Sequence, residues 1–152
     1  MDRIKMTRGA LLGVDFGDRR TGLAVCDPMR TIASAIGVIA PGGIEKTADE
    51  VAKTVSERGV TGVVVGLPVN MDGSEGSRAA RYRKFARLLE ERIDPSIPVC
   101  LFDERMTTMT AARFLNETNT RGAKRKEVID ALSAQIILQN FIDKLKNMQA
   151  RQ

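Results

Sequence analysis

A carboxylate placed directly after a continuously apolar run constrains the fold of this chain more than any other sequence feature. Residues 10–14 read Ala-Leu-Leu-Gly-Val, which is typical of a short buried strand, and Asp15 follows them. Burying a carboxylate at the end of a core strand is unfavourable by several kcal/mol unless a cation compensates it. A divalent metal ion is a compensating cation that also supplies chemistry. Asp15 is therefore the first candidate for a functional residue.

The spacing of apolar residues predicts the order of the elements. Three apolar runs come first, and the short turn-rich connection between the first two favours an antiparallel hairpin. Helical spacing begins at Ile44, and strands and helices then alternate. Strands are expected at 10–16, 22–26, 32–39, 62–66 and 97–102, and helices at 44–59, from Ser74 or Ser77 to 93, at 107–115 and at 126–146.

This order predicts an α/β fold with a mixed five-stranded sheet and helices on both faces. The 152 residues are enough for one domain and few for two, so we expect a single domain over 1–152. Residues 1–9 are charged and are expected to form a flexible basic segment.

The charge balance and the missing histidines limit the chemistry. The chain has 24 Lys and Arg against 19 Asp and Glu, which gives a net charge of +5, and it has no His. A basic surface favours polyanions such as nucleic acid, although a solvated cationic surface explains the charge equally well. Without histidine, Ser-His and Cys-His catalysis and His-based zinc sites are excluded. Carboxylates, lysines, hydroxyls or an oxygen-ligated metal must do any chemistry.

Cysteine usage and hydropathy point to an intracellular protein. Cys26 and Cys100 each lie in an apolar run and are interpreted as small buried hydrophobic residues, not as a disulfide framework. The first ten residues lack the apolar core of a signal peptide, and no apolar stretch is long enough to span a bilayer. A cytoplasmic location is expected.

Two further carboxylates fall where they would meet Asp15. Glu104 follows the last predicted strand, and Asp130 lies near the start of the final predicted helix. Ser133 and Ala134 share a helix face with Asp130 and are small enough to let that helix approach the sheet closely. Three converging acids are a typical site for Mg²⁺ or Mn²⁺. Two such ions about 3.5–4 Å apart can activate a water and stabilise a leaving oxygen in phosphodiester hydrolysis.

Each of these acids also has a purely structural interpretation. Asp130 would be favoured by the helix dipole alone, and Glu104 would be satisfied by an ion pair with Arg105. Asp103 competes with Glu104 as the ligand, because neighbours in a strand point to opposite faces and the end of this strand is not fixed by the sequence.

Basic residues cluster in segments that favour phosphate binding. The loop 66–74 leads into a helix N-terminus, a suitable place for an anion, and Arg78 and Arg81 follow in its first turns. Arg121, Lys124 and Arg125 lie in a basic stretch just before the last carboxylate. A solvated loop is the default interpretation of such a stretch, but a neighbouring acid cluster makes phosphate-backbone contact more attractive. With few aromatic residues, recognition through backbone and shape is expected.

The segment 15–22 also resembles the first phosphate loop of the sugar kinase and actin-like ATPases, in which an Asp and glycines lie in a hairpin. Those enzymes close two comparable lobes on the nucleotide. This chain is long enough for one lobe, so its length argues against the ATPase interpretation.

Four motifs in order resemble the YqgF family of pre-16S rRNA nucleases and Holliday junction resolvase-like proteins. They are Asp-Phe-Gly at 15–17, Val-Gly-Leu-Pro at 65–68 with Asn-Met-Asp-Gly at 70–73, Asp-Glu-Arg at 103–105 before Thr107 and Thr108, and Asp130 before Ser133, Ala134, Ile137 and Leu138. The similarity runs from about residue 10 to 142. It implies a ribonuclease H-like fold and a bacterial protein that matures the 5′ end of small-subunit rRNA by metal-dependent cleavage.

Carried over by position, Asp15, Glu104 and Asp130 are the acids that would bind Mg²⁺ or Mn²⁺ and act in catalysis, and no organic cofactor is expected. Arg78, Arg81, Arg121, Lys124 and Arg125 would contact nucleic acid. Structured RNA is the favoured partner, with ribosomal particles as a further one. Two alternatives stay open: a resolvase of four-way DNA junctions, and a non-catalytic nucleic-acid or ribosome-binding module that keeps the acids for structure.

Overall fold

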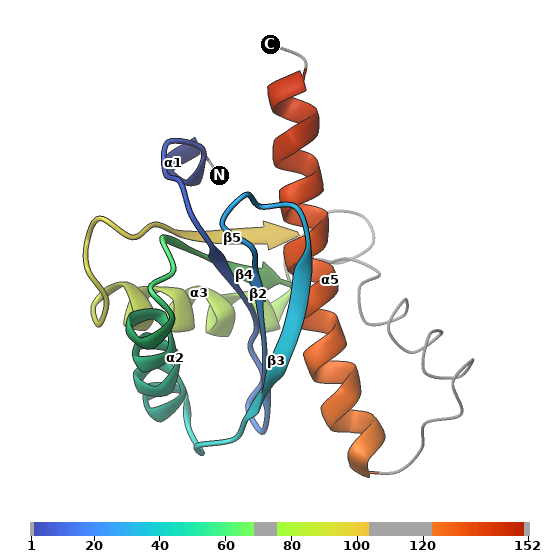
Figure 1. Cartoon of the computed structure of the whole chain (residues 1–152). Coiled ribbons are helices and arrows are strands. Elements are labelled where there is room, and N and C mark those ends of the chain that lie inside the picture. Colours follow the sequence, from blue (N-terminus) through green and yellow to red (C-terminus); the bar gives the residue numbers. More distant parts are fainter. Residues whose placement is uncertain (1, 69–75, 104–122, 151–152) are drawn as a thin grey trace.

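A computed structural model describes residues 2–68, 76–103 and 123–150, which form a mixed five-stranded sheet with helices on both faces (Figure 1). The strand order is β3-β2-β1-β4-β5; β1 pairs antiparallel with β2 and parallel with β4. The strands are β1 (Leu11–Asp15), β2 (Thr21–Cys26), β3 (Ala33–Ile39), β4 (Gly62–Leu67) and β5 (Val99–Asp103), and the helices α1 (Asp2–Lys5), α2 (Ile44–Arg58), α3 (Ser77–Glu90) and α5 (Ala123–Ala150). The predicted sheet and its opening antiparallel hairpin are confirmed.

The sheet separates two apolar layers. Helices α2 and α3 cover one face and the long helix α5 crosses the other (Figure 1). Along β1 the side chains alternate: Leu12 and Val14 belong to the α2/α3 layer, whereas Leu11 packs in the α5 layer with Ile137 and Leu138. This alternation follows from the two-residue period of a strand. It decides which strand-end residues can face α5.

Helix α5 also covers the free edge of the sheet. The side-chain oxygens of Gln135 and Gln139 accept hydrogen bonds from the backbone N–H groups of Ala35 (3.0 Å) and Ala33 (2.8 Å) on the edge strand β3. An uncovered strand edge invites pairing with another chain. These two glutamines therefore anchor α5 to the sheet and satisfy part of its edge.

A glycine lies at the C-terminal end of α2 and another directly before α3. Gly59 ends α2 in the left-handed conformation (φ 62°), as the sequence predicts for a glycine after a helix. Helix α3 begins at Ser77, one of the two predicted starts, and Gly76 precedes it without a side-chain cap hydrogen bond. Ser74 and the helix predicted at 107–115 lie outside the described residues.

The start of the chain differs from the flexible segment that its charges suggest. Residues 2–5 form α1, and Ile4 is fully buried in the α5 layer. Arg30, in the left-handed region (φ 56°), donates to the backbone oxygens of Ile4 (3.0 Å) and Gly9 (2.8 Å). One apolar side chain and one arginine thus attach this segment, a tertiary effect that charge counting does not detect.

Cys26 is buried and Cys100 half-buried, and both are free thiols, so the expectation of no disulfide between them agrees with the structure. Burial raises the pKa of the Cys26 thiol. Across the described ranges, no helix has both the length and the apolar character needed to cross a membrane.

Candidate active site

Asp15 is the last residue of the central strand β1, and it faces α5. It shares the strand face of Leu11 and Gly13, both of which lie against that helix. The residue is half-buried, and its partner on the antiparallel neighbour β2 is Gly22. A carboxylate therefore stands where the sheet, the β1–β2 turn and α5 meet.

Two glycines bring α5 unusually close to the sheet at this point. A β-carbon at residue 22 would lie 1.9 Å from the backbone oxygen of Asp130, and one at residue 13 would lie 3.1 Å from that of Ala134. Only a glycine fits at position 22 without moving the helix. Because Gly22 is paired with Asp15, this contact places Asp130 beside the end of β1. Ser133 and Ala134 are fully buried, which confirms the predicted close approach.

Arg20, in the β1–β2 turn, forms an ion pair with Asp130. Its Nε lies 2.7 Å from Oδ2 of Asp130, and the two side chains are 33% and 24% exposed. The sequence interpretation did not assign a role to Arg20. The sequence feature that could have identified Arg20 is its place in the turn that directly follows Asp15, the strongest candidate acid.

One buried polar atom near Asp130 has no partner among the described residues. Ser133 lies three residues further along α5, and its Oγ is buried without a hydrogen bond to any described group. Buried hydroxyls are normally hydrogen-bonded.

The alternation of side chains along β5 shows on which side of the sheet Asp103 lies, and Asp103 is the rival of Glu104 as a metal ligand. Cys100 and Phe102 pack in the α5 layer, and Val99 and Leu101 pack in the other layer. Asp103, the exposed last residue of β5, therefore shares the α2/α3 face and points away from the side of Asp15. Glu104 lies outside the described residues, so its role stays a prediction.

Arg78 and Arg81 lie beside the β1–β2 turn, on the α2/α3 side. Arg81 forms an ion pair with Asp18, and Arg78 donates to the Tyr82 hydroxyl (3.0 Å). With Phe16, which stacks between the sheet and α3, these side chains line a small hollow of about 50 Å³. Both arginines are therefore held at the same end of the sheet as Asp15.

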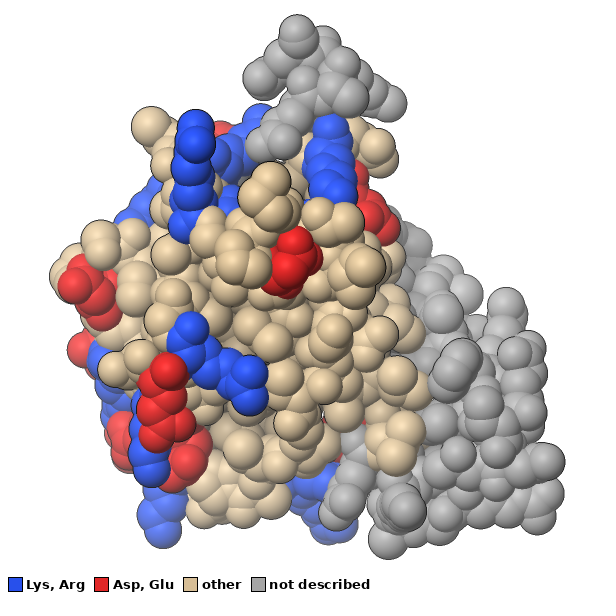
Figure 2. All heavy atoms as spheres, viewed as in Figure 1, with Lys and Arg blue, Asp and Glu red and all other residues tan. Residues whose placement is uncertain are grey.

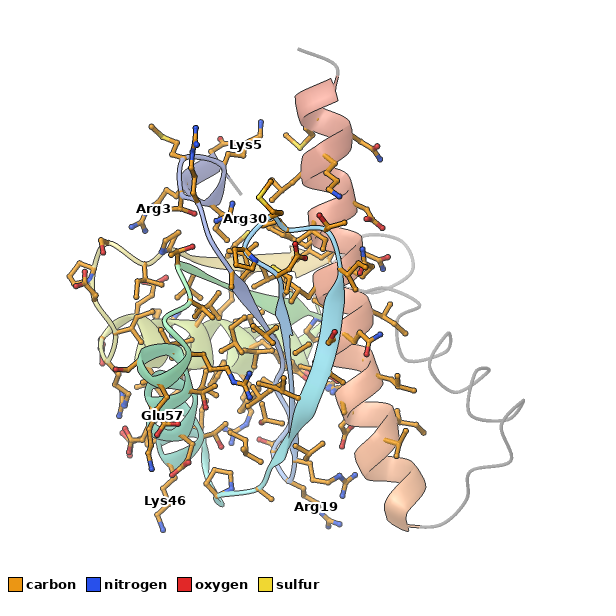
Figure 3. All side chains as sticks on the ribbon, in the orientation of Figure 1. Arg3, Lys5, Arg19, Arg30, Lys46 and Glu57 are labelled. Carbon is orange, nitrogen blue, oxygen red and sulfur yellow. The ribbon has the colours of Figure 1, made fainter. Side chains whose placement is uncertain are left out.

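The other predicted basic residues are less fully described. Lys124 and Arg125 belong to the first turn of α5, six and five residues before Asp130, and only their backbone is described. Arg121 lies outside the described residues. Arg19, in the β1–β2 turn, is exposed at this end of the molecule (Figure 3).

The donor set fits a hard divalent cation. Asp15 and Asp130 offer carboxylate oxygens, the ligand type that Mg²⁺ and Mn²⁺ prefer. In the described part of the chain no group of three acidic or cysteine side chains comes within range of one ion. The third predicted ligand, Glu104, is outside that part.

Comparisons with known proteins decide the family. Residues 9–144 match the family model described as "RuvX: Holliday junction resolvase". The chain belongs to the RuvX family. It is 44% identical over 138 residues to a "Putative pre-16S rRNA nuclease" of Paracoccus denitrificans, which covers 91% of this chain and 86% of that protein. It is 43% identical over 134 residues to a protein of the same name from Pelotomaculum thermopropionicum, covering 88% and 86%. The predicted YqgF resemblance is confirmed.

Solved structures show that the RuvX chain has the fold of the junction resolvases. The Fowlpox virus resolvase in complex with Holliday junction DNA matches with a TM-score of 0.59 at 10% identity, covering 90% of this chain and 98% of that one. RuvC of Thermus thermophilus in complex with a Holliday junction matches with a TM-score of 0.56 at 13% identity, covering 91% and 96%. The ribonuclease H-like fold class is confirmed.

Proposed function

We propose that this protein is a divalent-metal-dependent endonuclease that cleaves phosphodiester bonds of precursor 16S rRNA during maturation of its 5′ end. The observation that carries the proposal is the contact of Gly22 with Asp130, which sets a helix carboxylate against the strand position paired with Asp15. The names of the relatives from Paracoccus and Pelotomaculum support precursor rRNA as the substrate.

Asp15, Asp130 and Glu104 would hold Mg²⁺ or Mn²⁺. A divalent ion bound there supplies activation of a water molecule and neutralises the charge that develops on the phosphate. Two of these acids come from elements whose relative position is fixed by close backbone packing, so their separation changes little when a substrate binds. The third acid follows directly on β5, which is parallel to β4.

The cations at this end of the sheet would position the phosphate backbone. Arg20 pairs with Asp130, and a cation bound to that carboxylate would release the guanidinium to a phosphate oxygen. Arg78 and Arg81 stand on the other side of the β1–β2 turn. Arg121, Lys124 and Arg125 extend the basic surface in the proposal.

The second candidate is a resolvase of four-way DNA junctions, which the description of the matching family favours. A junction has two-fold symmetry, so this activity requires two copies of the site and predicts a dimer on the substrate. In a third, non-catalytic alternative, Asp130 serves only to pair with Arg20.

One assay separates the three. The protein is incubated with Mn²⁺ and either an RNA that spans the immature 5′ end of 16S rRNA or a four-way DNA junction. Cleavage of the RNA alone supports the proposal, whereas paired symmetric cuts in the junction favour the resolvase. Binding of either substrate without cleavage, by a protein that also fails to bind Mn²⁺, favours the non-catalytic module.

A further inference from the structure

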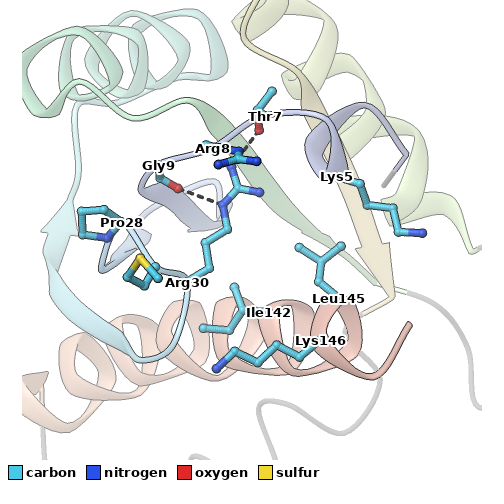
Figure 4. A pocket seen from close by; sticks show the side chains of 10 residues that line it. Lys5, Thr7, Arg8, Gly9, Pro28, Arg30, Ile142, Leu145 and Lys146 are labelled. Carbon is cyan, nitrogen blue, oxygen red and sulfur yellow. Dashed lines mark hydrogen bonds between the residues drawn. The ribbon is translucent and has the colours of Figure 1, made fainter. Parts of the chain in front are cut away.

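A basic cavity lies at the end of the sheet opposite the carboxylates. It has a volume of about 400 Å³ and is framed by the segment after α1, the β2–β3 turn and the C-terminal half of α5 (Figure 4). Among the described residues, its lining includes the cationic side chains of Lys5, Arg8, Arg30 and Lys146 and no carboxylate. Figure 3 shows Lys5 and Arg30 at this end and Arg19 at the other. The volume falls in the range of small-ligand sites, roughly 300–1,000 Å³.

Arg30 gives the cavity a fixed cationic wall. Its guanidinium donates to the Thr7 hydroxyl (2.7 Å) and the Thr61 hydroxyl (3.3 Å), besides the oxygens of Ile4 and Gly9. All these acceptors are neutral, so the four bonds hold the side chain in place and leave its positive charge uncompensated. A rigid cation of this kind favours an anion beside it without a large cost in side-chain entropy.

The other three cations also lack a negatively charged partner in the described part of the chain. Lys5, Arg8 and Lys146 come from α1, the following segment and α5, and none forms an ion pair with a described carboxylate. In Figure 2, several separate Lys and Arg side chains lie at this upper end of the molecule, with other residues between them. Four like charges around one cavity raise the local potential, which an anion would relieve.

Apart from Thr7 and Gly9, the rest of the lining is apolar. Ile142 and Leu145 of α5 are buried core residues behind the cavity, and Pro28 and Met29 are exposed residues of the β2–β3 turn. Met29 is 82% exposed. A purely inorganic anion would gain nothing from these walls. A ligand that joins a phosphate to a flat apolar ring would use both parts.

We propose that this cavity binds a phosphate-bearing nucleotide, either as one unit of a bound nucleic-acid strand or as a free nucleotide. Lys146 lies sixteen residues after Asp130 on α5, about 24 Å away at a rise of about 1.5 Å per residue. A duplex covers that length in about seven base pairs at about 3.4 Å per step. As a strand anchor the cavity would hold substrate far from the acids, and this part of the inference rests on the proposed nuclease function.

The test measures binding without cleavage. Fluorescence polarisation with a labelled RNA long enough to span both ends of the sheet is recorded in EDTA at several salt concentrations. The variant Lys5→Gln/Lys146→Gln lowers the net charge from +5 to +3. The control Lys46→Gln/Lys53→Gln removes the same charge from exposed positions on α2. Calorimetry with AMP and with inorganic phosphate tests the free ligands.

We expect the cavity variant to bind the RNA about tenfold more weakly than the control variant. Its salt slope should fall by about 1.4, since each phosphate contact on a single strand contributes about 0.7. If the cavity variant loses AMP binding but binds the RNA as tightly as the control variant does, the cavity is a site for a free nucleotide. Equal RNA affinities together with no AMP binding would overturn the proposal. Because EDTA prevents cleavage, a failed nuclease assay leaves this result interpretable.

Discussion

The ion pair between Arg20 and Asp130 places a protein cation on a carboxylate that we assign to a metal. Both partners are partly exposed, and such a pair contributes about 1 kcal/mol. The pair lies where the turn after β1 meets α5, so a divalent ion that binds Asp130 would compete with Arg20 for the same oxygen. Arg20 would then limit metal affinity when no nucleic acid is bound.

The substitution Arg20→Gln should tighten Mn²⁺ binding to the nucleic-acid-free protein. Removing a competitor worth about 1 kcal/mol corresponds to about a fivefold lower Kd. Isothermal titration calorimetry measures this change, with Arg19→Gln as a control that loses the same charge from the exposed neighbouring position. Equal Mn²⁺ affinity in both variants would show that Arg20 does not compete for the metal site.

At the residue scale the sequence predicted that Asp15 and Asp130 would lie close together, but not that Arg20 would lie beside them. Asp15 and Asp130 were identifiable because a strand end and a helix face have regular positions. Arg20 was not, since a turn residue has no periodicity and its partner lies 110 residues away. The sequence could not tell whether Asp103 or Glu104 faces Asp15, because a shift of one residue in the strand moves a side chain to the opposite face of the sheet.

At the scale of elements, the site depends on how closely α5 approaches β2. The backbone oxygen of Asp130 occupies the space where a β-carbon of residue 22 would stand. Close packing of this kind tolerates little added volume, because the neighbouring backbone must move.

Gly22→Ala should therefore displace the start of α5 and destabilise the protein by about 3 kcal/mol, near the upper end for an overpacked core. Gly13→Ala should destabilise the protein less, because its β-carbon would meet Leu138 at 2.8 Å and the Ala134 oxygen at 3.1 Å, a milder overlap. Urea unfolding measures both free energies of unfolding. A Gly22→Ala protein as stable as wild type would contradict the packing described for this contact.

The β2–β3 turn that frames the basic cavity should respond to acid. The Asp27 carboxylate accepts backbone N–H bonds from Thr31 (2.8 Å) and Ile32 (2.7 Å), and these bonds lower its pKa below the usual value. A lowered folded-state pKa contributes stability above the unfolded pKa and loses it as the pH falls through the folded one.

Asp27→Ala should thus lower the unfolding temperature at neutral pH and have a smaller effect at an acid pH below the lowered pKa of the wild-type carboxyl, where that carboxyl is also protonated. Thermal unfolding followed by circular dichroism at both pH values measures the difference. Asp27→Asn keeps an acceptor oxygen, so its unfolding temperature at neutral pH should lie between those of wild type and Asp27→Ala. A penalty for Asp27→Ala that does not change with pH would show that the charge of Asp27 has no part in the turn.

Element order and sheet type were predictable because the change from alternating to helical spacing at Ile44 is a local signal. The attachment of the N-terminal segment was not, because it depends on Arg30, which is distant in sequence, and on one buried isoleucine. The sequence left Ser74 and Ser77 open as the start of α3, and in the structure the helix begins at Ser77 directly after Gly76.

At the scale of the whole molecule, the candidate metal-binding acids and the basic cavity lie at opposite ends of one sheet. The acids lie where β1 ends, and the basic cavity lies where β1 begins, with α5 connecting the two. A chain with a net charge of +5 that places its candidate metal-binding acids at one end can bind a polyanion along its length and still concentrate divalent ions at one point. The charge distribution follows from the fold and could not be predicted from composition.

The measurement that tests the central claim most directly is Mn²⁺-dependent cleavage of the 16S rRNA precursor by wild type and by Asp15→Asn. We predict that the variant loses cleavage completely yet unfolds at the same temperature as wild type or slightly higher without metal, because a carboxylate charge is removed. Added Mn²⁺ should raise the unfolding temperature of wild type but not of the variant. Cleavage at the wild-type rate by a folded Asp15→Asn protein would contradict the account.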